Sequence, residues 1–222
     1  MKSAREFVAE FLGTFALTFI SGAVIMQAKN VDAAAGLLEV ALANGLVLFL
    51  MISAFMRVSG NFNPAVSLGL LVSGRITPTQ AGTFILGQFS GAIIAALTLK
   101  GLFPAALWEA ARGTRQLVSL DVSTGQAFAL EAIATAFMMT AYMGTVIDTK
   151  GPKLGGLATG IAATVGILAI GPLTGGSMNP ARTIGPMVAT GAYEGLALYL
   201  AAPIVGAVSA ALLYRHLMLD AE

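Results

Sequence analysis

The triplet Asn-Pro-Ala occurs twice in the sequence, as Asn63-Pro64-Ala65 and as Asn179-Pro180-Ala181. Asparagine is a favoured N-cap because its side chain accepts a hydrogen bond from a free amide of the first turn, and proline fits the first helical position. Each triplet therefore predicts the start of a helix. The apolar runs that follow, residues 65–72 and 181–188, are too short to cross a lipid bilayer at about 1.5 Å per residue. We expect two half-helices.

These two helix starts could recognise a neutral solute. A helix N-terminus carries unpaired amides and about half a positive charge, and the NH₂ groups of Asn63 and Asn179 add further donors. Irregular backbone at membrane depth is tolerated only where protein buries it or where it lines water, so two such loops imply a pore. Neutral solutes that accept hydrogen bonds would pass, whereas cations and protons would be repelled. A single Asn-Pro pair is usually only a turn, but two copies at matching places of a repeat argue against that reading.

Three charged residues accompany the triplets. Arg182 follows Asn179 by three residues, which places it one turn along the same helix face. A charge inside the membrane costs about 3 kcal/mol on insertion scales, so we expect Arg182 to line the pore, with a structural ion pair to Glu10 or Glu131 as the alternative. We expect those two glutamates to be embedded structural carboxylates that accept hydrogen bonds from the loop amides before each half-helix. A proton relay is the alternative role for them.

Composition places most of the chain in an apolar environment. Of 222 residues 57% are hydrophobic and 10% are charged, whereas about a quarter of the residues in a soluble domain are charged. The chain is therefore expected to be an integral membrane protein in contact with the lipid bilayer. The net charge of +1 without a basic tract argues against a nucleic-acid partner. The absence of cysteine excludes disulfides, thiolate metal sites and a cysteine nucleophile.

Hydropathy predicts an all-α membrane protein with six transmembrane helices and a polar linker at about residues 100–124. The predicted spans cover residues 7–26, 37–55, 79–99, 126–147, 154–170 and 194–213.

Matching residues recur at nearly constant separations along the chain. The asparagines of the triplets are 116 residues apart, Glu10 and Glu131 are 121 apart, and Gly91-Ala92 and Gly206-Ala207 are 115 apart. These offsets predict a single channel domain over residues 1–222, built from two homologous halves at about 1–100 and 125–215. Because each half holds three spans, an odd number, the second half enters the membrane from the opposite side. Such an inverted repeat places a site at the midplane, where the two half-helices point their N-termini at each other.

The distribution of Lys and Arg predicts the orientation. Seven lie on the side of both termini and four on the other, with Arg182 left out of the count. The positive-inside rule then puts both termini in the cytoplasm. We expect the plasma (inner) membrane as the location. The seven are Lys2, Arg5, Arg57, Arg75, Lys150, Lys153 and Arg215, and the four are Lys29, Lys100, Arg112 and Arg115.

Several short stretches together resemble a known family. They are Glu10-Phe11-Leu12-Gly13-Thr14-Phe15, Ser59-Gly60 before Asn63-Pro64-Ala65-Val66, Gly87-Gln88 with Gly91-Ala92, Glu131 with Ala134-Thr135-Ala136-Phe137, and Asn179-Pro180-Ala181-Arg182 with Gly185-Pro186. Over its whole length the chain resembles the aquaporin, or major intrinsic protein, family. The resemblance implies six transmembrane helices plus two re-entrant half-helices in two inverted repeats. It also implies a homotetramer with one passive pore per subunit, no cofactor, no metal and no enzymatic reaction.

The family narrows its pore at four places, and the matching positions here are Asn44, Ile167, Gly176 and Arg182. Water-selective members resemble one another in having an aromatic residue and a histidine at the first two. The smaller Asn44 and the aliphatic Ile167 therefore imply a wider filter. Such a filter would admit glycerol, urea, ammonia or a neutral metalloid acid as well as water.

Other positions differ from this pattern. Thr183 and Tyr199 resemble the water-channel members, whereas glycerol-conducting members usually have Asp at the first of these positions. The first triplet lacks the family's histidine two residues before Asn63, and the loop there is one residue short. The solute preference at the mouth near Asn61 and Phe62 is therefore left open.

Two other classes of function compete with a channel. An ion- or proton-coupled secondary transporter with inverted repeats would need carboxylates within the spans, and two of the four nearby ones, Glu39 and Glu194, lie at span ends. An intramembrane enzyme would need a nucleophile and base or a set of metal ligands, but the only histidine, His216, is in the tail. We therefore expect a passive channel for water and small uncharged solutes.

Overall fold

The computed structural model describes residues 2–30 and 36–219. Within these residues six helices are long and apolar enough to cross a bilayer, with the π-helical turn Met143–Ile147 extending the fourth. Two shorter helices, α3 and α8, start at the two Asn-Pro-Ala triplets, as predicted, and have 9 and 11 residues. The six long helices are α1 (Lys2–Gln27), α2 (Leu37–Phe55), α4 (Pro78–Leu102), α6 (Thr124–Tyr142), α7 (Leu157–Thr174) and α9 (Leu196–Leu217); the shorter ones are α3 (Pro64–Val72), α5 (Ala105–Ala110) and α8 (Pro180–Thr190).

The fifth span differs from the prediction at both ends. It was expected at residues 154–170, whereas α7 covers Leu157–Thr174. The chain before α7 forms a turn in which Gly155 has a φ of 55°, in the left-handed region that favours glycine. At the other end the helix continues past Pro172 and stops only at Gly175, whose φ of 79° gives a left-handed C-cap.

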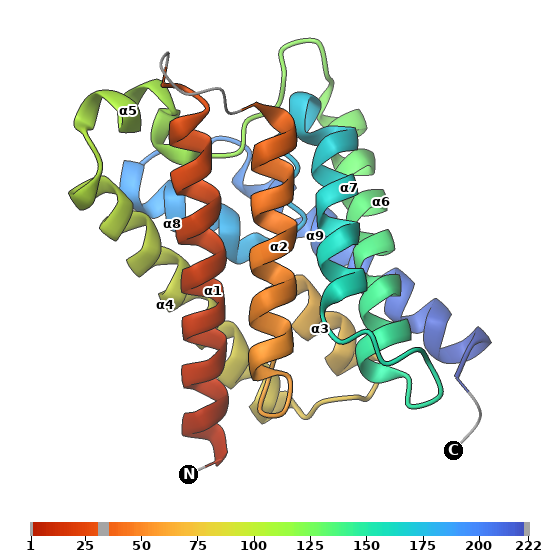
Figure 1. Ribbon diagram of the computed structural model, residues 1–222. Helices are drawn as coiled ribbons and strands as arrows, with labels where there is room; N and C mark the ends of the chain where they lie inside the picture. Colours follow the sequence, from red (N-terminus) through yellow and green to blue (C-terminus); the bar gives the residue numbers. More distant parts are fainter. Residues whose placement is uncertain (1, 31–35, 220–222) are drawn as a thin grey trace.

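The predicted linker is partly helical and packs against the bundle. It contains α5 and a 3₁₀ turn at Arg112–Thr114. Trp108 of α5 is buried, and Arg115 forms an ion pair with Glu194 in the loop before α9. The connection therefore covers one end of the bundle (Figure 1).

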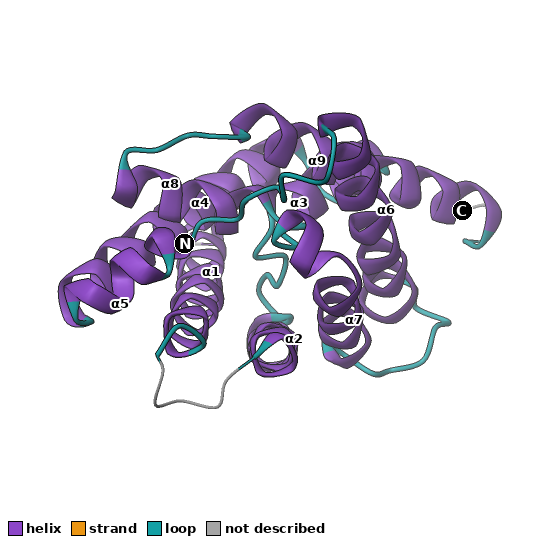
Figure 2. Cartoon of the chain, turned by 90° about the horizontal axis from the view of Figure 1, so that it is seen from above, coloured by secondary structure: helices purple, strands orange, loops and turns teal. Residues whose placement is uncertain are grey.

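Helix packing follows one pattern twice. Helix α1 packs on α4 as α6 packs on α9, and α3 packs on α9 as α8 packs on α4. Helices α2 and α7 lie side by side (Figure 2). The list stays the same when α1, α2, α3 and α4 are exchanged with α6, α7, α8 and α9, respectively. The division into two inverted halves stays a prediction, which this packing supports.

Two glycines let the most closely packed helices approach each other. A Cβ atom on Gly91 of α4 would lie 2.4 Å from the Phe11 carbonyl oxygen of α1. A Cβ atom on Gly206 of α9 would lie 2.0 Å from the Ala132 carbonyl oxygen of α6. Both distances are shorter than van der Waals contact with backbone that cannot move aside. The repeated Gly-Ala pair in the sequence therefore marks two equivalent helix crossings of the small-residue type.

Helix α1 begins and α9 ends at the same end of the bundle, where α2 also ends and the α6–α7 connection lies (Figure 1). Asp148 organises that connection. Its carboxylate accepts hydrogen bonds from the Lys150 amide at 2.8 Å, the Gly151 amide at 3.2 Å and the Tyr214 hydroxyl of α9 at 3.0 Å. The Lys150 amide in particular holds the pKa of Asp148 below its usual range. These contacts fix the chain just before α7.

Candidate pore and selectivity filter

Each triplet caps its half-helix as the sequence predicts. The Asn63 side-chain oxygen accepts a hydrogen bond from the Ala65 amide at 2.9 Å. The Asn179 side-chain oxygen accepts from the Ala181 amide at 3.0 Å and the Arg182 amide at 3.3 Å. Since the oxygen of each carboxamide is used within its own helix, its NH₂ group points away from that helix.

Each NH₂ group binds the loop that precedes the other triplet. Asn63 donates to the Met178 carbonyl at 2.8 Å, and Asn179 donates to the Phe62 carbonyl at 2.8 Å. Each acceptor is the residue directly before the other asparagine, so the bonds are reciprocal. They join the N-terminal ends of α3 and α8 in the middle of the bundle.

Phe62 and Met178 have the same unusual backbone conformation. Their φ angles are 49° and 51°, in the left-handed region, which costs about 1–2 kcal/mol for a residue with a side chain. Both side chains are almost fully buried, and the Phe62 ring occupies the space that a Cβ on Gly13 would need. Packing and the hydrogen bonds of these loops offset the cost.

Glu10 of α1 holds the first loop. One of its carboxylate oxygens accepts from the Asn61 amide at 2.8 Å and from the Ser59 hydroxyl. The other accepts from the Phe62 amide at 2.7 Å and from the Gln88 side chain at 2.7 Å. All available directions around this fully buried carboxylate are thus occupied by protein donors.

Glu131 of α6 holds the second loop in the equivalent way. One oxygen accepts from the Ser177 amide at 2.8 Å and the Thr174 hydroxyl at 2.7 Å, and the other accepts from the Met178 amide at 2.7 Å. The amides that each glutamate binds are those of the last two residues before an asparagine. These contacts favour the structural role expected for Glu10 and Glu131.

Arg182 is 4% exposed and lies at the cavity wall. Its Nη1 donates to the carbonyls of Gly176 at 2.6 Å and Ser177 at 2.9 Å, so backbone oxygens hold the guanidinium in place. Its Nε has no hydrogen-bond partner within the described part of the chain. A buried N–H donor of a charged group is therefore left without a protein acceptor, which is costly unless another molecule binds it.

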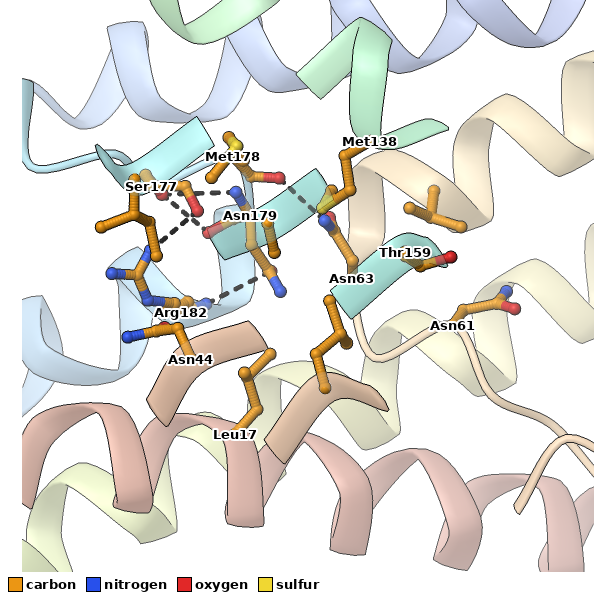
Figure 3. Close-up of a pocket in the computed structure, with 14 residues that line it drawn as sticks. Leu17, Asn44, Asn61, Asn63, Met138, Thr159, Ser177, Met178, Asn179 and Arg182 are labelled. Carbon is orange, nitrogen blue, oxygen red and sulfur yellow. Dashed lines mark hydrogen bonds between the residues drawn. The ribbon is translucent and has the colours of Figure 1, made fainter. Parts of the chain in front are cut away.

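One cavity is lined by five of the predicted site residues, Asn44, Asn63, Ile167, Asn179 and Arg182. Its walls enclose about 400 Å³ of space between atoms, the openings included. Figure 3 shows Arg182 and Asn44 at one side, Asn63 and Asn179 in the middle, and Thr159 and Asn61 at the other side. The lining residues are Leu17, Asn44, Leu48, Asn61, Asn63, Val66, Met138, Thr159, Ala163, Ile167, Ser177, Met178, Asn179 and Arg182.

The positions matched to the family's filter are neighbours in space. Asn44, Ile167 and Arg182 all line the cavity. Gly176 does not line it, but its carbonyl holds Arg182, and a Cβ on Gly176 would lie 3.2 Å from the Ile167 Cα. The glycine therefore lets its loop lie directly against α7.

The Asn44 side chain is fixed. Its oxygen accepts from the Ser21 hydroxyl at 2.5 Å, and its NH₂ donates to the Val40 carbonyl at 2.9 Å. The second N–H of the carboxamide takes part in neither of these hydrogen bonds. Asn44 thus adds a positioned polar group close to Arg182 (Figure 3).

Several lining residues, among them Met138 and Thr159, carry no signal in the sequence that marks them as part of a pore. Each is a common residue type inside an apolar span, and neither belongs to a motif. Of the two residues at the shortened loop, Asn61 lines the cavity, whereas the Phe62 side chain is fully buried. Hydropathy could not have separated these cases, because it carries no information on which face of a span meets a pore.

Comparison with known proteins gives one family. The family model described as Major intrinsic protein matches residues 1–214. The chain is 38% identical over 215 residues to the glycerol uptake facilitator protein-like 6 of Lactiplantibacillus plantarum, covering 95% of this chain and 97% of that protein. It is 35% identical over 218 residues to the probable aquaporin NIP5-1 of Arabidopsis thaliana, covering 97% and 70%.

Among solved structures, the X-ray structure of the aquaglyceroporin from Plasmodium falciparum is similar to this one. The TM-score is 0.85 and the sequence identity is 24%, with 97% of both chains covered. This likeness confirms the expected fold of long membrane-spanning helices with short helices between them.

Replacing Glu131 by Gln should destabilise the protein. One of its acceptor oxygens becomes an NH₂ group, which places a donor against the donor of Ser177 or Met178. Leaving such buried groups unpaired costs about 1–3 kcal/mol. We expect a lower thermal unfolding midpoint for purified Glu131→Gln in detergent. Glu109→Gln, the same change at an exposed position of α5, is the control, and equal midpoints for the two variants would contradict the role given to Glu131.

Proposed function

Because the chain belongs to the major intrinsic protein family, we propose that the cavity between Asn63, Asn179 and Arg182 is the narrow part of its pore. Proteins of this family are channels and not enzymes. This protein is a multi-pass membrane protein that conducts water and small uncharged solutes passively. The observation that supports the position of the pore is the reciprocal pair of hydrogen bonds between the two triplets.

The polar groups in this cavity suit neutral solutes. Each asparagine gives one N–H to the opposite loop and keeps a second N–H that can face the lumen. The positive ends of two half-helices and the guanidinium of Arg182 oppose the entry of a cation. A neutral solute with an acceptor oxygen exchanges its water partners for these donors, so its cost of dehydration is lower.

The spans contain no comparable site for a coupling ion within the described residues. Both oxygens of Glu10 and of Glu131 accept hydrogen bonds from loop amides, and neither glutamate lines the cavity. The transporter alternative therefore has no support from these residues.

We infer that Asn44, Ile167, Gly176 and Arg182 form the selectivity filter. Asn44 and Ile167 leave more room than an aromatic residue and a histidine would, and a glycine stands at the third position. We therefore expect this filter to admit a solute larger than water. The relative named as a glycerol uptake facilitator is in line with glycerol as one such solute.

We propose that the protein is a homotetramer with both termini in the cytoplasm. The end of the bundle where α1 begins and α9 ends carries seven Lys and Arg of the sequence, against four at the other end. Native mass spectrometry in detergent should give a mass of four subunits. A protease added outside intact cells should leave an epitope tag at either terminus uncut. Cleavage of the tag would show the opposite orientation.

Replacing Arg182 by Val should let protons or cations leak through the pore while water still passes. The substitution removes the only charge in the described cavity lining and replaces it with an apolar group of smaller reach. Proteoliposomes with an internal pH dye would report the leak, and light scattering on the same vesicles would report water flux. Arg5→Val, at an exposed position of α1, is the matched control. Unchanged permeability to both protons and water would place Arg182 outside the pore.

The double variant Asn44→Phe with Ile167→His should reduce glycerol and urea flux more than water flux. The larger side chains narrow the filter, which excludes the larger solutes first. Stopped-flow light scattering on proteoliposomes can compare water, glycerol, urea, ammonia and arsenite for the wild type and the variant. Leu46→Phe, on the exposed face of α2, controls for the added aromatic ring. Equal losses for all solutes would contradict the filter assignment, and a wild type that passes only water would contradict the wide bore.

A further inference from the structure

The hydroxyl of Thr159 is a polar group in the cavity that the proposed filter does not use. Thr159 lies in the first turn of α7, is 2% exposed and lines the cavity. Its Oγ1 has no hydrogen-bond partner within residues 2–30 and 36–219. A buried hydroxyl without a partner costs about 1–3 kcal/mol, so a ligand or water is expected to bind there.

The position of Thr159 in its helix explains why the hydroxyl is free. Other threonines of this protein, such as Thr98 and Thr140, donate to the carbonyl four residues earlier in the same helix. For Thr159 the residue four positions earlier is Gly155, which lies before the start of α7 in a left-handed turn. Its carbonyl accepts from Thr145 instead, at 3.4 Å. The hydroxyl therefore has no acceptor in its own helix.

Asn61 supplies a second polar group to the same part of the cavity (Figure 3). Its oxygen accepts from the Tyr142 hydroxyl at 2.8 Å, and its NH₂ donates to the Ser67 hydroxyl at 3.1 Å. Ser67 is in turn held by the Gln88 side chain at 2.9 Å. This network fixes the carboxamide, which still has one N–H and one lone pair to offer.

These two residues are well separated from the filter. Thr159 precedes Ile167 by eight residues on α7, which corresponds to about 12 Å along a helix. Figure 3 places the two asparagines of the triplets between Arg182 and Thr159. The neighbouring wall is apolar and includes Val66 and Met138.

We propose that Thr159 and Asn61 form a second solute-binding position in the pore, which favours small polyols and ureas over water. The proposal rests on the proposed function, since it requires a bore that admits such solutes. A water molecule in a file keeps hydrogen bonds to the waters before and behind it. A polyol or urea carries several polar groups, and those that point sideways in a narrow bore meet no water. These groups must therefore form hydrogen bonds with the pore wall. The hydroxyl of Thr159, both donor and acceptor, meets that need for a hydroxyl or amide group.

Replacing Thr159 by Val tests the proposal, because valine keeps the shape and removes the hydroxyl. One hydrogen bond of ordinary strength corresponds to about a two- to ten-fold effect. We expect glycerol and urea flux through Thr159→Val proteoliposomes to fall by about that factor relative to water flux. Thr159→Ser retains the hydroxyl and should restore the wild-type ratio. Thr140→Val makes the same change on the exposed face of α6 and should have no effect.

The outcomes separate this proposal from the one on which it rests. If the wild type passes water but neither glycerol nor urea, the wide bore is wrong and the second position falls with it. If the wild type passes glycerol and Thr159→Val keeps the wild-type ratio of glycerol to water flux, only the second position is overturned. Equal losses in Thr159→Val and Thr159→Ser would also overturn it, because the hydroxyl would then not be the cause.

Discussion

Backbone amides and carbonyls cannot be left without hydrogen-bond partners in the apolar interior of this bundle, and the whole site depends on how that constraint is met. Two loops enter the bundle and stop at its middle, where each turns into a half-helix. Glu10 and Glu131 bind the amides of these loops, and the asparagine of each triplet binds a carbonyl of the other loop. Neither loop satisfies all of its own backbone groups. Each therefore requires the other, which explains why the triplets occur as a pair.

The cavity follows from this arrangement. The carbonyls of Phe62 and Met178 each accept one N–H of the opposite asparagine. The second N–H of Asn63 and of Asn179 is then left for the proposed lumen. The loop before Asn179 also presents two carbonyls to Arg182, which keeps a buried cation in position without a carboxylate partner. Close helix crossings at Gly91 and Gly206 bring α1 to α4 and α6 to α9, so that the two glutamates reach their loops.

The two ends of the cavity are chemically different although the frame is repeated. Around the second triplet, a charged guanidinium and the Asn44 carboxamide face the lumen. Around the first, Asn61 of the loop before Asn63 lies at the wall, where a chain of neutral side chains from Gln88 to Tyr142 fixes it. In the proposed pore, a solute would meet a charged polar position and then a neutral one, with the asparagine pair between them.

The sequence by itself determined what depends on local pattern. Long apolar runs predicted the spans, Asn-Pro predicted the starts of α3 and α8, and the spacing of Glu10 and Glu131 linked each glutamate to a loop. These signals are short-range, and each has a direct physical cause in capping or in burial of apolar surface. The end of α7 was less predictable, because Pro172 suggests a stop that the helix passes.

Only the tertiary structure decided which groups share the pore. The bonds from Asn63 to Met178 and from Asn179 to Phe62 join residues more than 100 positions apart, and no local rule specifies such partners. The same holds for Gly176, which acts through its carbonyl and its contact with Ile167, and for Thr159, whose hydroxyl is free because α7 begins where it does. Selectivity depends on these contacts across the bundle, since hydropathy defines a span but not the face that it turns to the lumen.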